Sequence, residues 1–116
     1  MEYALTRGEG KFQVTLVATT IGIDLLVRIF NENAHIGAVA IGEYDFKNKR
    51  ASVSVITRLG HKDDAIAQRA AYLISKSAKK TVCVVAGVHL DNIAQPEIVK
   101  LMENALGTVE DFLKQL

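Results

Sequence analysis

Apolar and polar side chains alternate with a period of two along much of the first half of the chain. From Phe12 to Ala18 every second residue is apolar, which is typical of a strand with one buried face. Similar segments occur at residues 3–7, 23–30, 35–43 and 51–57, separated by turn-forming residues such as Gly8-Glu9-Gly10 and Asn31-Glu32-Asn33. The first half is therefore predicted to form five strands in an antiparallel meander.

The second half changes to a helical period. Between Lys62 and Lys80 the side chains of the expected buried stripe recur at intervals of three and four, and they are Ile66, Ala70, Leu73, Ile74 and Ser77. Residues 81–90 are almost continuously apolar, as in a strand covered on both faces. Gln95-Pro96-Glu97 opens a last helix, with its buried stripe at Ile98, Met102, Ala105, Val109, Phe112 and Leu116. Gly107 is expected to mark a kink or break there.

The element order is β-β-β-β-β-α-β-α, which predicts a single α+β domain over residues 1–116. Its mostly antiparallel sheet has about six strands, and the two helices pack on one face. The strands also carry apolar side chains in the alternate register, at Val17, Leu26, Phe30, Val39, Ile41 and Ile56. Such an uncovered apolar face favours a homo-oligomer. A one-residue slip in one strand's register is the alternative, since it would exchange that strand's faces.

Composition narrows the classes of function. The formal net charge is +1, and the densest basic run, Lys47-Asn48-Lys49-Arg50, falls at an expected hairpin turn. With seven aromatic residues and no basic-aromatic surface, nucleic acid is not an expected partner. The sequence shows neither a signal peptide nor the roughly 20 apolar residues of a membrane helix, so we expect a cytoplasmic protein without membrane contact. Cys83, the only cysteine, is expected to be a core residue.

The three histidines, His35, His61 and His89, all lie at ends of predicted elements. An antiparallel pairing of the fourth and fifth strands and a right-handed crossover to the sixth would bring them to one sheet edge. Glycines at the same edge would let a ligand approach the backbone closely. The candidate binding residues are His35, Gly37, Gly60, His61, Lys62, Asp63, Gly87, His89 and Asp91.

The first helix is expected to begin near Gly60-His61-Lys62, where free N–H groups and the lysine would favour a phosphate or carboxylate. The alternative is ordinary capping, in which Asp63 and Asp64 complement the helix dipole. A metal site formed by histidines and aspartates ranks below both, because no HxxxH or CxxC spacing supports it. The sequence also contains no nucleophile elbow, Walker motif or dinucleotide fingerprint.

Three segments resemble the LpdD-like family of prenylated-flavin chaperones: His35-Ile36-Gly37-Ala38-Val39-Ala40, Gly60-His61-Lys62-Asp63-Asp64 and Ala86-Gly87-Val88-His89-Leu90-Asp91-Asn92. The resemblance extends over roughly residues 11–115. That family accompanies prenylated-flavin-dependent aromatic acid decarboxylases and is similar in fold to proteasome assembly chaperones. The resemblance implies an accessory role and the same α+β architecture, with prenylated FMN as bound cargo.

Three hypotheses follow. The first is a non-catalytic chaperone for the assembly or cofactor loading of a larger enzyme, in which Lys62 and the helix N-terminus receive the flavin phosphate while His61 and His89 bond nearby polar atoms. The second is a protein-binding module resembling proteasome assembly chaperones. The third, ranked below both, is a small metal-dependent enzyme that uses His35, His61, Asp63, His89 and Asp91.

Overall fold

A computed structural model describes residues 2–59 and 63–116 of the chain. Six strands, one 3₁₀ turn and two α-helices follow one another in the predicted order. The elements are β1 Glu2–Arg7, η1 Gly10–Phe12, β2 Val14–Ile21, β3 Asp24–Phe30, β4 Ala38–Asp45, β5 Arg50–Thr57, α1 Asp64–Ala78, β6 Val82–Gly87 and α2 Gln95–Leu113. The predicted α+β class is confirmed.

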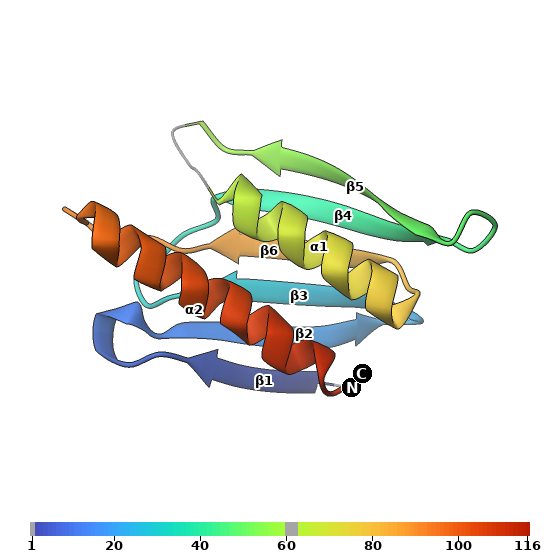
Figure 1. Cartoon of the computed structure of the whole chain (residues 1–116), viewed down its shortest axis with the longest axis horizontal. Helices are drawn as coiled ribbons and strands as arrows, with labels where there is room; N and C mark the ends of the chain where they lie inside the picture. Colours follow the sequence, from blue (N-terminus) through green and yellow to red (C-terminus); the bar gives the residue numbers. More distant parts are fainter. Residues whose placement is uncertain (1, 60–62) are drawn as a thin grey trace.

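The strands form one sheet in the order β1-β2-β3-β6-β4-β5 (Figure 1). The last strand in sequence, β6, lies between β3 and β4, pairing in parallel with β3 and antiparallel with β4. The remaining pairs of neighbours are antiparallel. The prediction that β6 is covered on both faces is wrong, because both helices lie on the same side of the sheet (Figure 1) and Cys83 and Val85 on the other side are only half-buried.

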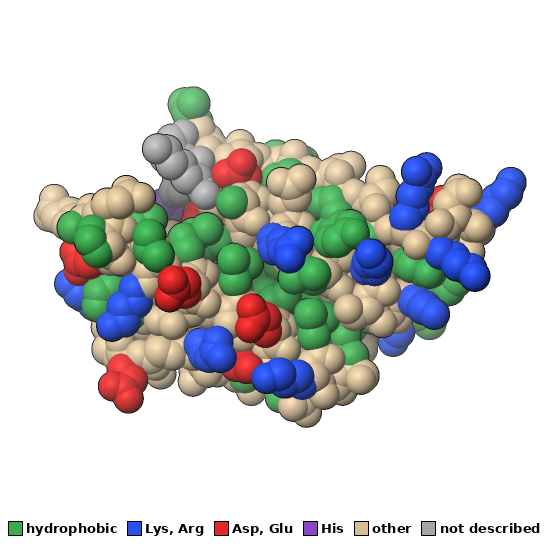
Figure 2. Space-filling model, viewed as in Figure 1, with side chains coloured by type: hydrophobic (Ala, Val, Ile, Leu, Met, Phe, Trp, Pro, Cys, Tyr) green, Lys and Arg blue, Asp and Glu red, His purple; other side chains and the backbone are tan. Residues whose placement is uncertain are grey.

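Both helices pack on one face of the sheet, as predicted (Figure 1). Helix α1 contacts β4, β5 and β6, and α2 contacts β1 and β2. The core between the layers contains alternate strand residues, such as Leu16, Val27 and Val84, together with Ile74 of α1 and Phe112 of α2. On the outer side of the helices, acidic and basic side chains are interspersed (Figure 2).

The prediction from the sequence was wrong for parts of both helices. Helix α2 runs unbroken through Gly107, so the predicted kink or break is absent, and the space left by the missing side chain is occupied by the Arg7 guanidinium. Its buried stripe contains Leu101 and Thr108, whereas Ile98 and Leu116 near its ends are exposed. In α1 the buried polar residue is Ser75, which donates a hydrogen bond to the Ala71 carbonyl, and the predicted Ser77 is exposed.

Two predicted strands were also too long. Strand β4 begins at Ala38, so His35 precedes it, and β6 ends at Gly87, so His89 follows it. Strand β6 ends at Gly87 because β3 ends at Phe30, and the pair Phe30–Gly87 is the last of the parallel ladder. The apolar sequence continues past this point, at Val88, and the predicted strand was therefore longer than the segment that pairs with β3.

The sheet face opposite the helices is open, and we refer to it as the open face. It carries the six apolar residues predicted for it: Val17, Leu26, Phe30 and Val39 are half-buried, and Ile41 and Ile56 are exposed. The register places Leu26 beside Cys83 and Val39 beside both Ile56 and Val85. Cys83 is therefore half-buried on this face rather than enclosed in the core, and burial raises the pKa of its thiol.

No helix in the described part of the chain is long and apolar enough to span a bilayer. Residues 47–49 of the basic run lie in the turn between β4 and β5, where a hairpin turn was predicted, and Arg50 is the first residue of β5. Asp45 organises this turn by accepting hydrogen bonds from the backbone N–H groups of Lys47 and Asn48.

Candidate functional site

One edge of the sheet brings together most of the residues that the sequence singled out. It is formed by the carboxyl ends of β3, β5 and β6, segments 31–37 and 88–94, and the start of α1 at Asp63, and we refer to it as the histidine edge. The strands meet there because β3, β5 and β6 run in the same direction and β4 runs against them. These elements are far apart in sequence, so the edge exists only in the folded chain.

His35 and His89 lie side by side at this edge. Their ring centroids are 5.7 Å apart and the ring planes are inclined by 33°. Both side chains are exposed, so their polar atoms can reach a ligand or water. The His89 ring nitrogen Nε2 lies 3.0 Å from a carboxylate oxygen of Asp91, which orients the imidazole.

Gly87 allows the two histidine segments to approach. A Cβ built on Gly87 would lie 2.2 Å from the carbonyl oxygen of His35 and 2.9 Å from its carbonyl carbon, both of them backbone atoms. Any larger residue would therefore push segment 31–37 away from β6. The space left by Gly87 is thus occupied by the backbone of His35, whereas the sequence had suggested that a ligand would approach there.

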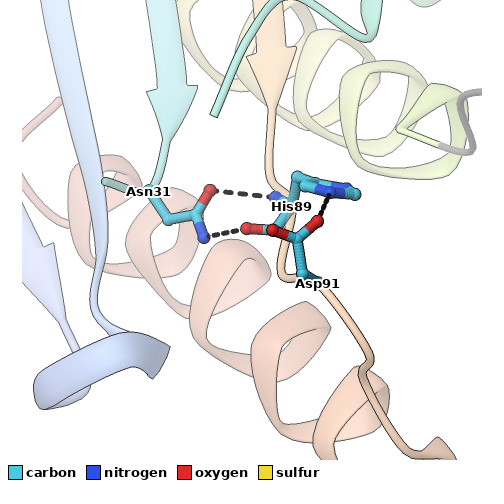
Figure 3. Close-up of polar contacts among 3 residues, drawn as sticks. All are labelled: Asn31, His89 and Asp91. Carbon is cyan, nitrogen blue, oxygen red and sulfur yellow. Dashed lines mark hydrogen bonds and ion pairs between the residues drawn. The ribbon is translucent and has the colours of Figure 1, made fainter. Parts of the chain in front are cut away.

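Asn31 fixes the segment that carries His89 (Figure 3). Its side-chain amide donates to the His89 carbonyl oxygen at 2.6 Å, and its amide oxygen accepts from the His89 N–H at 2.9 Å. The residue is 4 % exposed. The sequence analysis did not predict this role, because Asn31-Glu32-Asn33 has the composition of a turn. The one feature of the sequence that could have indicated it is that Asn31 directly follows the end of a strand.

Gly37 and Asp63 form a second close approach. A Cβ on Gly37 would lie 1.7 Å from a carboxylate oxygen of Asp63, so the carboxyl group occupies the space left by the glycine. Asp63 is 6 % exposed and is the N-cap residue of α1, although its side chain makes no capping hydrogen bond. The Gly37 N–H donates to the Ala86 carbonyl at 2.9 Å, which joins this pair to β6.

Six of the nine candidate residues thus lie at the histidine edge, and they are His35, Gly37, Asp63, Gly87, His89 and Asp91. The other three, Gly60, His61 and Lys62, lie outside the described residues. Within residues 2–59 and 63–116, no three histidine, cysteine, aspartate or glutamate side chains gather closely enough to hold a metal ion.

A cavity of about 400 Å³ adjoins the histidines, where the open face meets the histidine edge. Its lining comes from β3, β6 and segment 31–37, and the residues are Leu26, Arg28, Ile29, Phe30, Asn31, Ala34, His35, Ile36, Val85 and Gly87. Most of this lining is apolar, and His35, Asn31 and Arg28 provide its polar groups. We refer to it as the open-face cavity.

A hollow of similar size, about 430 Å³, is lined by residues of α1 and by Val53 of β5, and it contains none of the candidate residues. The open-face cavity differs in being lined by two of the candidate residues, His35 and Gly87. Cavities of roughly 300–1,000 Å³ with an apolar lining and a few polar groups are typical of sites for small organic ligands. The geometry therefore suits a flat, largely apolar molecule that carries polar substituents.

Comparisons with known proteins concern the fold and the family of the chain. No curated protein matches the sequence. A solved structure described as a novel chaperone complex for yeast 20S proteasome assembly superimposes with a TM-score of 0.66 at 17 % identity, over 99 % of this chain and 95 % of that one. At that identity the likeness concerns the fold. Residues 8–116 match the prenylated flavin chaperone LpdD-like domain, and the chain belongs to this family.

Proposed function

We propose that this chain is a non-catalytic, cytoplasmic accessory protein that binds prenylated FMN at the histidine edge and passes it to a larger enzyme. Membership of the LpdD-like prenylated flavin chaperone family supports the ligand class. The open-face cavity beside the paired histidines is the observation that gives this ligand a place. A flavin-dependent decarboxylase is the partner that the family resemblance implies.

The cavity residues fit the chemistry of a flavin. Leu26, Phe30 and Val85 provide an apolar floor on which a planar ring system can lie. Beside this floor, the imidazoles of His35 and His89 and the amide of Asn31 offer hydrogen bonds to polar atoms of the ring. Of the residues that the sequence assigned to binding, His35 and Gly87 line this cavity, and His89 adjoins it through His35.

Exposure of the site supports transport rather than catalysis. His35, Ile36 and His89 are all exposed, so a ligand here keeps contact with water on one side. Enzymes that transform a bound cofactor usually exclude water from the reacting atoms. A site that is open on one side lets the cargo leave without a large rearrangement, which is what a carrier requires.

The experiment is a titration of the purified protein with prenylated FMN and with FMN, followed by flavin fluorescence and by melting temperature. At a ligand concentration of about 100 Kd, binding adds about 2.7 kcal/mol of stability, which raises the melting temperature of a domain of this size on the order of 10 °C. The double variant His35→Ala/His89→Ala should weaken binding, whereas Lys76→Ala on the distant end of α1 should not. Unchanged fluorescence and melting temperature with both flavins would exclude the proposal.

A second candidate function is protein binding through the open face, first of all by a second copy of the chain. The six apolar side chains predicted for this face are half-buried or exposed, and Ile56 is 75 % exposed. Apolar surface of this kind is typical of association. A partner of the proteasome type is compatible with the shared fold. Co-purification with proteasome α-subunits tests that partner, and a protein that forms no such complex when mixed with them would exclude it.

A further inference from the structure

Arg28 is a cation placed among apolar residues of the open face. It lies on β3, and its neighbours in register are Val17 on β2 and Val85 on β6. Its guanidinium carbon lies 5.5 Å from the centroid of the Phe30 ring, within reach of a cation–π contact. Both residues line the open-face cavity. Arg28 is therefore the guanidinium that the cavity presents to a ligand.

No carboxylate in the described part of the chain forms an ion pair with Arg28. A guanidinium without an acidic partner is tolerated while water reaches it, and Arg28 is exposed. Covering it with a flat ligand or with another protein surface would remove that water, which is unfavourable unless an anion accompanies it. The position thus favours ligands that bring their own negative charge.

Two other described cations near the histidine edge, Lys11 and Arg58, are already engaged. The Lys11 ammonium lies 2.9 Å from a carboxylate oxygen of Glu97. Arg58 donates a hydrogen bond from its guanidinium to the Ile36 carbonyl at 2.8 Å, and it does not line the cavity. The start of α1 carries two acids, the buried Asp63 and the exposed Asp64, whose negative charge disfavours an anion there.

We propose that Arg28 binds the phosphate of the flavin nucleotide whose ring system lies in the open-face cavity, an inference that rests on the proposed function. Arginine suits this role because its planar fork can donate two parallel hydrogen bonds to phosphate oxygens. This assignment differs from the sequence expectation, which gave the phosphate to Lys62 and the first helix. It predicts that the protein distinguishes FMN from riboflavin through one side chain.

The test measures the affinity of the wild type and of four variants for prenylated FMN and for FMN. The dephosphorylated form of each flavin is measured as well, and the two affinities are compared. The wild type should prefer the phosphorylated form by about 10- to 100-fold, the range of charge-assisted hydrogen bonds. Arg28→Met should abolish this preference and leave the affinity for the dephosphorylated flavins nearly unchanged. Arg28→Lys should retain part of the preference for the phosphorylated form. Lys76→Met removes a distant charge and should retain the full preference, and Lys62→Met should retain it as well.

Two other outcomes would contradict either the role of Arg28 or the proposed function. A preference that survives in Arg28→Met, or that is lost in Lys62→Met, overturns the assignment to Arg28 while the proposed flavin function stands. A wild type that binds none of these flavins defeats the proposed function and with it this inference. Melting temperatures of the ligand-free variants establish that each is folded. Because Arg28 is exposed, its two variants should melt close to the wild type.

Discussion

The side-chain amide of Asn31 is hydrogen-bonded to both the N–H and the carbonyl oxygen of His89, across 58 residues of sequence. The two bonds continue the parallel pairing of β3 and β6 beyond Gly87, with a side chain in place of the backbone. His89 lies outside a regular element, yet both its backbone N–H and its carbonyl oxygen are hydrogen-bonded. The position of its imidazole beside His35 therefore depends on Asn31.

Replacing Asn31 with alanine should destabilise the protein by about 2 kcal/mol, because two hydrogen bonds are lost and the polar groups of His89 lose their partner. The free energy of unfolding in urea measures this effect. Flavin affinity should fall as well, since segment 88–94 is no longer tied to β3.

The neighbouring substitution Glu32→Ala is the control. Glu32 is exposed and follows Asn31 directly, so its removal should change the stability by less than about 0.5 kcal/mol. Equal effects of the two substitutions would contradict the role assigned to the Asn31 amide.

Gly37 and Asp63 should show a strong energetic coupling. Gly37→Ala is expected to cost about 1–3 kcal/mol in stability, because the new Cβ meets the Asp63 carboxyl group. In an Asp63→Ala background the carboxyl group is absent, so the same substitution should cost at least about 1 kcal/mol less. Urea unfolding of the four proteins in this double-mutant cycle gives the coupling.

Gly87→Ala provides the contrast within the same site. Its Cβ would meet backbone atoms of His35 rather than a side chain. The cost of Gly87→Ala should therefore be the same with Asp63 present or absent. If Asp63→Ala relieved both glycine substitutions equally, the contact between Gly37 and Asp63 would not be the cause.

The ion pair between Lys11 and Glu97 should make stability depend on pH in the acidic range. Glu97 accepts hydrogen bonds from the Lys11 ammonium and from the Ala94 N–H, and these hold the pKa of its carboxyl group below the ordinary value of 4.5. A pKa lowered in the folded state means that the stabilisation is fully present above the unfolded-state pKa and is lost as the pH falls through the folded-state pKa. The stability difference between wild type and Glu97→Gln should therefore shrink on acidification.

Urea unfolding at neutral pH and at several values below pH 4.5 measures this difference. Glu103→Gln is the matched control on the same helix, because Glu103 is exposed and has no ion pair among the described residues. A Glu97→Gln difference that stays constant down to the acid transition would show that the charge of Glu97 contributes nothing.

The rate at which the Cys83 thiol is labelled should show whether a second copy of the chain covers the open face. This thiol lies between Leu26 and Ile41 in register, and burial raises its pKa, so labelling by a disulfide reagent should be slower than for a free cysteine. If copies associate through this face, the labelling rate at constant pH should fall as the protein concentration rises. Sedimentation equilibrium should show the dimer over the same concentration range.

Ile41→Glu and Ile56→Glu should each abolish this concentration dependence, since a carboxylate on the open face opposes its burial. Ile23→Glu is the control, because Ile23 is 83 % exposed but lies in the turn between β2 and β3, away from the open face. A labelling rate that never changes with concentration would exclude association through this face.

The sequence determined the elements and the faces of the strands. Side chains alternate along a strand, so the polarity of each position shows which face it occupies without reference to any other strand. This is why the apolar residues of the open face, from Val17 to Ile56, were identified correctly. The prediction was less exact for the helices. The buried stripe of α2 was misplaced at Ile98, which lies in the exposed first turn, and at Leu116, which lies beyond the end of the helix at Leu113.

The tertiary structure alone decided how the site is assembled. Nothing local in the sequence indicates that β6 enters between β3 and β4, because pairing between distant strands depends on the whole core. That insertion brings Asn31 to His89, places Gly87 against His35, and makes one cavity from β3, β6 and segment 31–37. The sequence identified the histidines and glycines of this edge. The hydrogen bonds of Asn31 to His89 and the position of Arg28 in the cavity exist only in the folded chain.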